Sequence, residues 1–169
     1  MVQGEAAAIV GSRVERVNSR DDHGCFGCGR LNPYGLRLAF YRATGEEGVW
    51  APFTPATEHE GFAGVTHGGI VSAVLDEAMG WVVFARGVWA VTGKLAVSFR
   101  RPVEIGMETR ASAWVVSDGG RALQAAAELR RTDDAVLLAE GTATFIRVPE
   151  DQARAWQARY LVGADGAES

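Results

Sequence analysis

The 169-residue sequence predicts an α+β fold in which an antiparallel six-stranded sheet wraps around one long central helix. Residues 66–86 form a helix-period run that is apolar on nearly every side, two strand-like runs precede it, and four follow it. A helix that is apolar all round must be buried, and a curved sheet provides the cover. Because six strands leave a sheet edge and part of the helix uncovered, we expect self-association as a homodimer or a dimer of dimers, a homotetramer.

The central run places apolar residues at three- and four-residue intervals, which is the spacing of an α-helix. Its only ionised side chains before Arg86 are the adjacent acids Asp76 and Glu77. A carboxylate on such a helix loses hydration unless a partner or a cleft stabilises it, so an acid there is more often a functional group than a surface acid. Asp76 or Glu77 is therefore the first candidate for chemistry.

The start of this helix has two glycines, Gly68 and Gly69, which let the backbone approach another atom closely. The first N–H groups of a helix lack intrahelical partners and suit a developing oxyanion. At ~100° per residue, Asp76 lies ~80° around the axis from Gly68 and Glu77 lies ~180° away, so geometry favours Asp76. Gly68 and Asp76 are still ~12 Å apart along the axis, so both can act on one carbonyl only if a second copy of the chain contributes.

The residues before the helix predict three further elements. Valines at 10, 14 and 17 form one helical stripe, which predicts a short amphipathic helix within residues 1–20. Alternation over 36–41 and the run 48–53 predict two strands separated by a turn. A glycine-containing loop, 54–65, then leads to the helix.

After the helix, four runs alternate apolar and polar residues: 94–100, 109–115, 123–130 and 137–145. Gly, Asp and Pro residues between them are typical of hairpin turns. Residues 149–161 predict a terminal helix, with Trp156 and Tyr160 on one face, and the last seven residues are expected to be frayed. The chain is thus divided into an N-terminal extension (1–33), the sheet-and-helix domain (34–148) and a C-terminal helix and tail (149–169).

Composition limits the class of function. With 47% apolar and 22% charged residues, the chain reads as one soluble domain with a real core. A net charge of -4, and no basic cluster larger than the pairs Arg100–Arg101 and Arg130–Arg131, argue against nucleic acid. The N-terminus lacks the basic region of a signal peptide, and the central helix is shorter than the ~20 residues that span a bilayer. We expect a cytoplasmic protein without a membrane span.

The only two cysteines, Cys25 and Cys28, lie in a glycine-rich segment close to His23. A C-x-x-C pair is half of a zinc site, His23 would be a third ligand, and the fourth would have to be His59, His67, an acid or water. The alternative is a loop in which two reduced thiols pack as small hydrophobes. We favour this alternative, so no metal or cofactor is expected. The following glycines and proline argue against a redox pair, which should open a helix.

The order of elements, with HGG at 67–69 and the acid of LDEAMG eight positions after the first glycine, resembles the hotdog-fold thioesterases of the PaaI type. The resemblance covers residues 34–148, and CFGCGRLNPYGL is similar to a subgroup with a cysteine-bearing N-terminal extension. It implies that an acyl-CoA thioester lies across a dimer interface. The Gly68 amide would polarise the carbonyl, Asp76 of the partner subunit would attack it or activate water, and the Thr92 hydroxyl would help to hold the water or the acid.

One position departs from the family pattern. Many relatives have Asn or Gln seven residues before the motif glycine, where this chain has Gly61, so His59 or Glu60 would have to compensate. We expect His67 to close the loop at the helix start rather than to catalyse, and Glu77 to be paired at the interface or exposed at an end of the site. Aromatic side chains would line an acyl pocket, although most are expected in the core. The candidate catalytic residues are Asp76, Gly68, His67 and Thr92; the candidate substrate-binding residues are Gly61, Gly69, Glu77, Arg100 and Arg101, the arginines for coenzyme phosphates.

Three functions fit these features. We favour an acyl-thioester hydrolase. A hotdog hydratase or dehydratase would need a catalytic histidine with an acid, for which His67 and Asp76 are poorly matched, and a non-catalytic acyl-thioester binding module is the third possibility. The acyl group, the carrier (coenzyme A or an acyl carrier protein) and the role of Asp76 as nucleophile or general base are left open.

Overall fold

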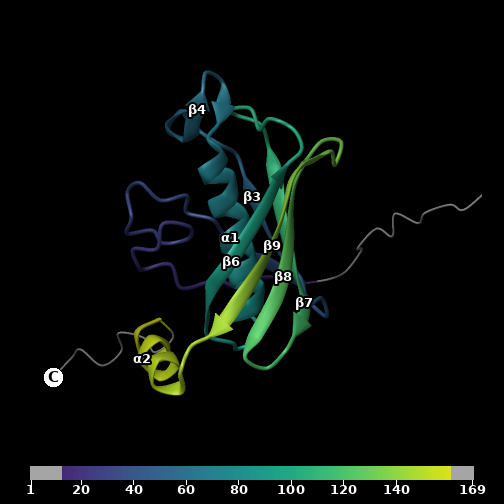
Figure 1. The fold of residues 1–169 in the computed structure, drawn as a ribbon. Helices are drawn as coiled ribbons and strands as arrows, with labels where there is room; N and C mark the ends of the chain where they lie inside the picture. The colour runs from purple at the N-terminus through teal and green to yellow at the C-terminus, as the bar shows by residue number, and fades with distance from the viewer. Residues whose placement is uncertain (1–12, 161–169) are drawn as a thin grey trace, which may run out of the picture.

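A computed structural model describes residues 13–160 of the chain (Figure 1). Its main elements follow the predicted order, with a long helix between an early and a late group of strands. The elements are β1 (Val14–Arg16), β2 (Tyr41–Ala43), β3 (Val49–Phe53), a 3-10 turn (Thr57–His59), β4 (Glu60–Phe62), β5 (Val65–Thr66), α1 (Gly68–Phe84), β6 (Ala90–Phe99), β7 (Thr109–Asp118), β8 (Ala122–Arg131), β9 (Leu137–Arg147) and α2 (Glu150–Tyr160).

The main sheet is antiparallel throughout, with the strand order β1-β2-β3-β7-β8-β9-β6. Helix α1 lies along one face of this sheet (Figure 1). The predicted fold class is confirmed, although the sheet has seven strands and not six. β4 and β5 form a separate two-stranded sheet beside the start of α1.

The seventh strand corrects the prediction of an N-terminal helix. Val14–Arg16 is extended and pairs with β2, with Val14 opposite Ala43. A stripe of three valines is too short to stabilise a helix alone, whereas the free edge of β2 offers backbone hydrogen bonds. Val10 and the rest of the predicted helix before residue 13 lie outside the described residues, as does the predicted tail.

The first predicted strand is also corrected, because only Tyr41–Ala43 is β-strand. Leu38 and Phe40 are buried, as the alternation predicted, but their backbone groups bond to a loop. Leu38 N–H donates to the Gly27 carbonyl, and Phe40 N–H donates to the buried Asn18 side chain. The N-terminal segment therefore occupies the place of a neighbouring strand.

The elements after α1 are those the sequence predicted. β6 begins four residues earlier than expected, at Ala90, and the terminal helix is present as α2. Within residues 13–160, β6 forms the end of the main sheet and pairs on one side alone, with β9. Val91 and Phe99 of β6 are 45% and 56% exposed, so this edge presents apolar side chains.

The core lies between α1 and the sheet. The sheet strands contribute many buried alanines here, and a Cβ added at Gly141 would lie 3.5 Å from the Met79 side chain. Small residues bring the helix close to the sheet, which leaves the two flanks of α1 to be covered by other segments. The buried residues of α1 are Val71, Val74, Leu75, Ala78, Met79, Val82 and Val83. Within residues 13–160, no helix is long and apolar enough to cross a membrane.

Candidate active site

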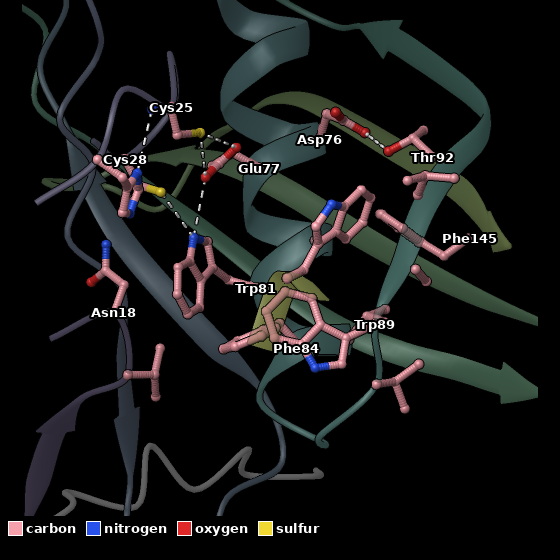
Figure 2. Close-up of a pocket in the computed structure, with 18 of the residues that line it drawn as sticks. Asn18, Cys25, Cys28, Asp76, Glu77, Trp81, Phe84, Trp89, Thr92 and Phe145 are labelled. Atoms are coloured by element: carbon pink, nitrogen blue, oxygen red, sulfur yellow. Dashed lines mark hydrogen bonds between the residues drawn. The ribbon is translucent and has the colours of Figure 1, made fainter. Parts of the chain in front are cut away.

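A cavity of about 400 Å³ lies beside the second half of α1 (Figure 2). Its polar lining consists of both acids of the helix, both cysteines and Thr92, together with Asn18, Ser19, Arg20 and His23 of the N-terminal segment. Aromatic and aliphatic side chains form the rest of its wall, and the N-terminal segment and α2 each contribute to it. The apolar lining residues are Val17, Trp81, Val83, Phe84, Val88, Trp89, Ala90, Val91, Phe145 and Trp156.

Asp76 projects from α1 toward β6 (Figure 2). The Thr92 hydroxyl donates a hydrogen bond to Asp76 Oδ1 at 2.8 Å, which is the contact that the resemblance implied. Burial raises the pKa of Asp76 above its usual value, and the hydrogen bond from Thr92 opposes this shift. Asp76 is thus a partly desolvated carboxylate with one oxygen held and the other free to act within the cavity.

The start of α1 lies away from this cavity. His67 is the N-cap, and its Nδ1 accepts the Gly69 N–H at 2.9 Å, which is the structural role expected for it. Among residues 13–160, the Gly68 N–H has no hydrogen-bond acceptor. A Cβ at Gly68 would lie 3.4 Å from the Phe99 ring, at the far end of β6 from Thr92. One chain therefore does not bring Gly68 and Asp76 to the same point.

Glu77 points to the opposite flank of α1, toward the cysteine loop (Figure 2). Its carboxyl oxygens lie 3.6 and 3.8 Å from Cys25 Sγ, and Trp81 Nε1–H donates to Glu77 Oε1 at 3.1 Å. The same indole N–H lies 3.4 Å from Cys28 Sγ. Burial raises the pKa of Glu77 to about 7. Within the protomer the N-terminal segment covers Glu77, so its carboxyl group is not exposed at an end of the site. Pairing of Glu77 at a subunit interface stays a prediction.

Two glycines allow the cysteine loop to close against Glu77. A Cβ at Gly27 would lie 2.4 Å from the Glu77 carboxyl group, and one at Gly29 would lie 2.1 Å from the backbone oxygen of His23. The two thiols are coupled: the hydrogen bond with Cys28 lowers the pKa of Cys25 to about 5, and the same contact raises that of Cys28. Sequence reasoning noted the cysteines and the second acid separately. The one hint in the sequence was that neither the cysteine pair nor Glu77 had a residue nearby in the sequence to complete a site.

The remaining substrate-binding candidates do not line this cavity. Arg100 pairs with Glu140 on β9 through a bond from Nε of 2.8 Å, and Arg101 is exposed nearby. A Cβ at Gly61 would lie 2.9 Å from His67 Cα, so the space of the Asn or Gln expected there is already occupied. The Arg100 guanidinium is therefore already paired within the protomer. This pairing gives no direct support for a contact between Arg100 and the coenzyme phosphates.

The aromatic residues divide between cavity, core and surface. Trp81, Phe84 and Trp89 line the cavity as a chain of edge-to-face rings, with centroids 5.0 and 4.8 Å apart. Phe53 is buried in the core, whereas Phe62 is 86% exposed. Asp76 and Glu77, two of the candidate site residues, lie at the end of this aromatic wall. The cavity therefore combines one apolar compartment with two acids in different surroundings.

Comparison with known proteins finds similarity to one family. A family model described as thioesterase superfamily matches residues 63–138. The acyl-coenzyme A thioesterase THEM4 of Xenopus laevis is 28% identical over 116 residues, which cover 68% of this chain and 51% of that protein. The chain thus spans about half the length of the curated relatives it matches.

Solved structures agree with this match. The PaaI protein of the E. coli phenylacetic acid degradation operon superposes with a TM-score of 0.62 at 19% identity, over 68% of this chain and 81% of that one. A phenylacetic acid degradation-related protein of Ralstonia eutropha JMP134 gives a TM-score of 0.58 at 26% identity, over 66% and 85%. The matched span holds Gly68, Asp76 and Thr92. The chain is therefore similar to the thioesterase superfamily over residues 63–138, and it has the hotdog fold seen in PaaI.

Proposed function

We propose that the protein hydrolyses an acyl-CoA thioester, with Asp76 as the nucleophile or general base. The observation that carries this proposal is the Asp76–Thr92 pair, a desolvated carboxylate oriented by a hydroxyl at the polar end of an apolar cavity. The name of the matched relatives, acyl-coenzyme A thioesterase, supports the reaction class and the carrier. An acyl carrier protein remains the alternative carrier.

The chemistry requires a base or nucleophile and a donor to the carbonyl oxygen. Asp76 takes a proton from water, whose oxygen attacks the thioester carbon, or its free oxygen attacks that carbon directly. The carbonyl π electrons move onto oxygen, and a backbone N–H stabilises the charge. Collapse of the intermediate returns the electron pair and breaks the C–S bond, so the coenzyme leaves as a thiolate. After direct attack by Asp76, water then hydrolyses the mixed anhydride, which releases the carboxylic acid and restores Asp76. Thr92 holds Asp76 Oδ1, which leaves Oδ2 for the reaction.

The oxyanion donor in this proposal is the Gly68 N–H of a second subunit. Asp76 contacts Thr92 near the beginning of β6, and Gly68 adjoins Phe99 at its end. β6 is an unpaired edge with exposed apolar side chains, which suits antiparallel pairing with a second β6 about a two-fold axis. An axis passing between Leu95 and Ala96 sets Thr92 opposite the partner's Phe99. Asp76 of one subunit then lies beside Gly68 of the other, in a homodimer that can assemble further into a tetramer.

The cavity favours an apolar acyl group. Trp81, Phe84 and Trp89 provide flat apolar surface. The one arginine that lines the cavity, Arg20, pairs with Asp22, and no ion pair within residues 13–160 includes Asp76. A carboxylated acyl chain would bring a second negative charge next to two acids, which costs binding energy. We therefore place the acyl group of the substrate in the aromatic compartment and its thioester at Asp76.

A panel of acyl-CoA substrates tests this function. We expect loss of the thioester absorbance with aromatic and medium-length acyl-CoAs, and much slower loss with dicarboxylic ones. Absorbance is preferable to a thiol reagent, because Cys25 is accessible to such reagents. Tight binding of acyl-CoA without hydrolysis would favour the binding module, and hydration of an enoyl-CoA without thiol release would favour the hydratase.

A further inference from the structure

The cysteine loop and α1 bring three metal-ligating groups to one point outside the Asp76–Thr92 pair. Cys25 Sγ, Cys28 Sγ and a Glu77 carboxylate oxygen all lie within 4.8 Å of one another. We propose that these three side chains bind a divalent cation of the zinc class, which fastens the N-terminal segment to α1. This proposal reverses the preference that the sequence alone supported, because the acid required to complete the site becomes visible only in the fold.

The distance between the Cys25 sulfur and the Glu77 carboxylate fits a tetrahedral ion. With Zn–S of ~2.3 Å and Zn–O of ~2.1 Å, tetrahedral angles put sulfur and oxygen ligands ~3.6 Å apart. Cys25 Sγ lies 3.6 Å from Glu77 Oε1. Two thiolates and a carboxylate form a donor set that zinc accepts. All three side chains line the cavity, so water from the cavity would supply the fourth ligand.

The groups around the three ligands have the character of a metal site. The backbone of Gly27 and Cys28 helps to lower the pKa of Cys25, and the Trp81 indole donates to both Cys28 Sγ and Glu77 Oε1. Such donors orient thiolate and carboxylate ligands and spread their charge. The ligand set has one donor, Glu77, from the middle of α1 and two from a loop more than 45 residues earlier.

No ion pair among the described residues joins these three groups to a lysine or arginine. Arg16, Arg20 and Arg30 of the N-terminal segment pair with Asp21 and Asp22, and no ion pair within residues 13–160 includes Glu77. A buried carboxylate is costly without a positive partner. A divalent ion provides that charge and also explains why Gly27 and Gly29 are needed to bring the loop so close.

The ion would also shape the cavity. Val17, Asn18, Cys25 and Cys28 form its N-terminal wall, and this segment contacts α1 through the cysteine loop. Metal binding to residues distant in sequence stabilises a fold because the unfolded chain has no preformed site. Loss of the ion should therefore lower the melting temperature and loosen this wall.

Metal analysis and cobalt substitution test the proposal. Protein purified without chelators should contain close to one zinc per chain, and protein in which cobalt(II) replaces zinc should show thiolate-to-cobalt charge transfer and the intense visible bands of tetrahedral cobalt. Chelation should lower the melting temperature, and added zinc should restore it. A folded, reduced protein that takes up neither zinc nor cobalt would overturn the proposal, as would a cobalt spectrum without thiolate bands.

Variants locate the ligands. Cys25→Ser, Cys28→Ser and Glu77→Gln should each weaken zinc affinity at least tenfold in competition with a chromogenic chelator. Asp76→Asn is the matched control, because it changes the neighbouring acid of the same helix and should keep full metal content. Equal zinc content in Glu77→Gln and the wild type would contradict the role given to Glu77. If a cysteine variant does not fold, the cobalt spectrum of the wild-type protein still decides whether sulfur binds the ion.

Discussion

Asp76 and Glu77 are neighbours in sequence, yet the two flanks of α1 give them different surroundings. At ~100° per residue they point to different sides of the helix. Asp76 faces β6, where one hydroxyl holds it and the cavity leaves its other oxygen open. Glu77 faces the cysteine loop, where two sulfurs and an indole surround it. The segment packed against each acid therefore decides its chemistry. The Asp76 side of α1, the open flank, suits a reacting carboxylate, and the Glu77 side, the closed flank under the cysteine loop, suits a metal ligand.

The sharpest test of this contrast is the removal of each charge in turn. Asp76→Asn keeps the shape of the side chain but removes the nucleophile or base, so hydrolysis of acyl-CoA should fall by ~10²–10⁴-fold. Glu77→Gln should reduce the rate much less. Initial rates and melting curves of both variants provide the measurement, and near-normal turnover by folded Asp76→Asn protein would end the proposed mechanism.

A second prediction concerns the oxyanion donor, the Gly68 N–H, which the proposal takes from a second subunit. Mix Gly68→Val subunits with Asp76→Ala subunits, each inactive alone, under conditions that allow exchange. In a mixed dimer, the Asp76→Ala chain contributes an intact Gly68 that faces the intact Asp76 of the other chain, so one of two sites works. Random pairing makes half the dimers mixed, and activity should return to about a quarter of wild type.

This experiment has a clear negative outcome. If each chain held a complete site, every site in the mixture would keep one lesion, and mixing would restore nothing. Exchange itself is checked by mass spectrometry of differently tagged subunits. If exchange is demonstrated and activity does not return, Gly68 and Asp76 do not act together at one shared site.

A third prediction addresses the hydroxyl on the open flank. Thr92→Val keeps the branched shape and removes the donor to Asp76 Oδ1, so the rate should fall about tenfold, the equivalent of ~1.4 kcal/mol for one hydrogen bond to a charged group. Thr92→Ser retains a hydroxyl and is the control that should recover most of the rate. Equal rates for the Val and Ser variants would show that this hydrogen bond does not orient the carboxylate.

The two flanks also differ in how far the sequence predicted them. The open flank was predictable because helical period, HGG and the acid at a fixed spacing all lie in one local segment, and the Thr92 contact followed from the family resemblance. The closed flank was not, because Cys25 and Glu77 are 52 residues apart and no period or spacing links them. The missed strand β1 has the same cause: a three-residue edge takes its conformation from β2, not from its own pattern.

The last prediction concerns the stability of the cysteine loop on the closed flank. A Cβ at Gly29 would overlap the His23 backbone oxygen and lie 2.6 Å from Cys25 N, whereas nothing lies within 4 Å of a Cβ at Gly24 in the same loop. Gly29→Ala should therefore destabilise the protein by ~1–3 kcal/mol, which corresponds to a decrease in melting temperature of ~2–12 °C, and Gly24→Ala should change it little. Thermal denaturation measures both.

The same two variants test whether the cysteine loop affects only which acyl groups the cavity accepts, or also the rate of hydrolysis. Because Gly29→Ala disturbs the loop that covers Glu77 and leaves the Asp76–Thr92 hydrogen bond on the other side of α1, turnover of a short acyl-CoA below the melting transition should stay within a few-fold of wild type. Selectivity among longer acyl groups should broaden, since the N-terminal wall of the cavity moves. A large loss of turnover with the short substrate would instead mean that the two flanks act as one unit, and the contrast between Asp76 and Glu77 would have to be abandoned.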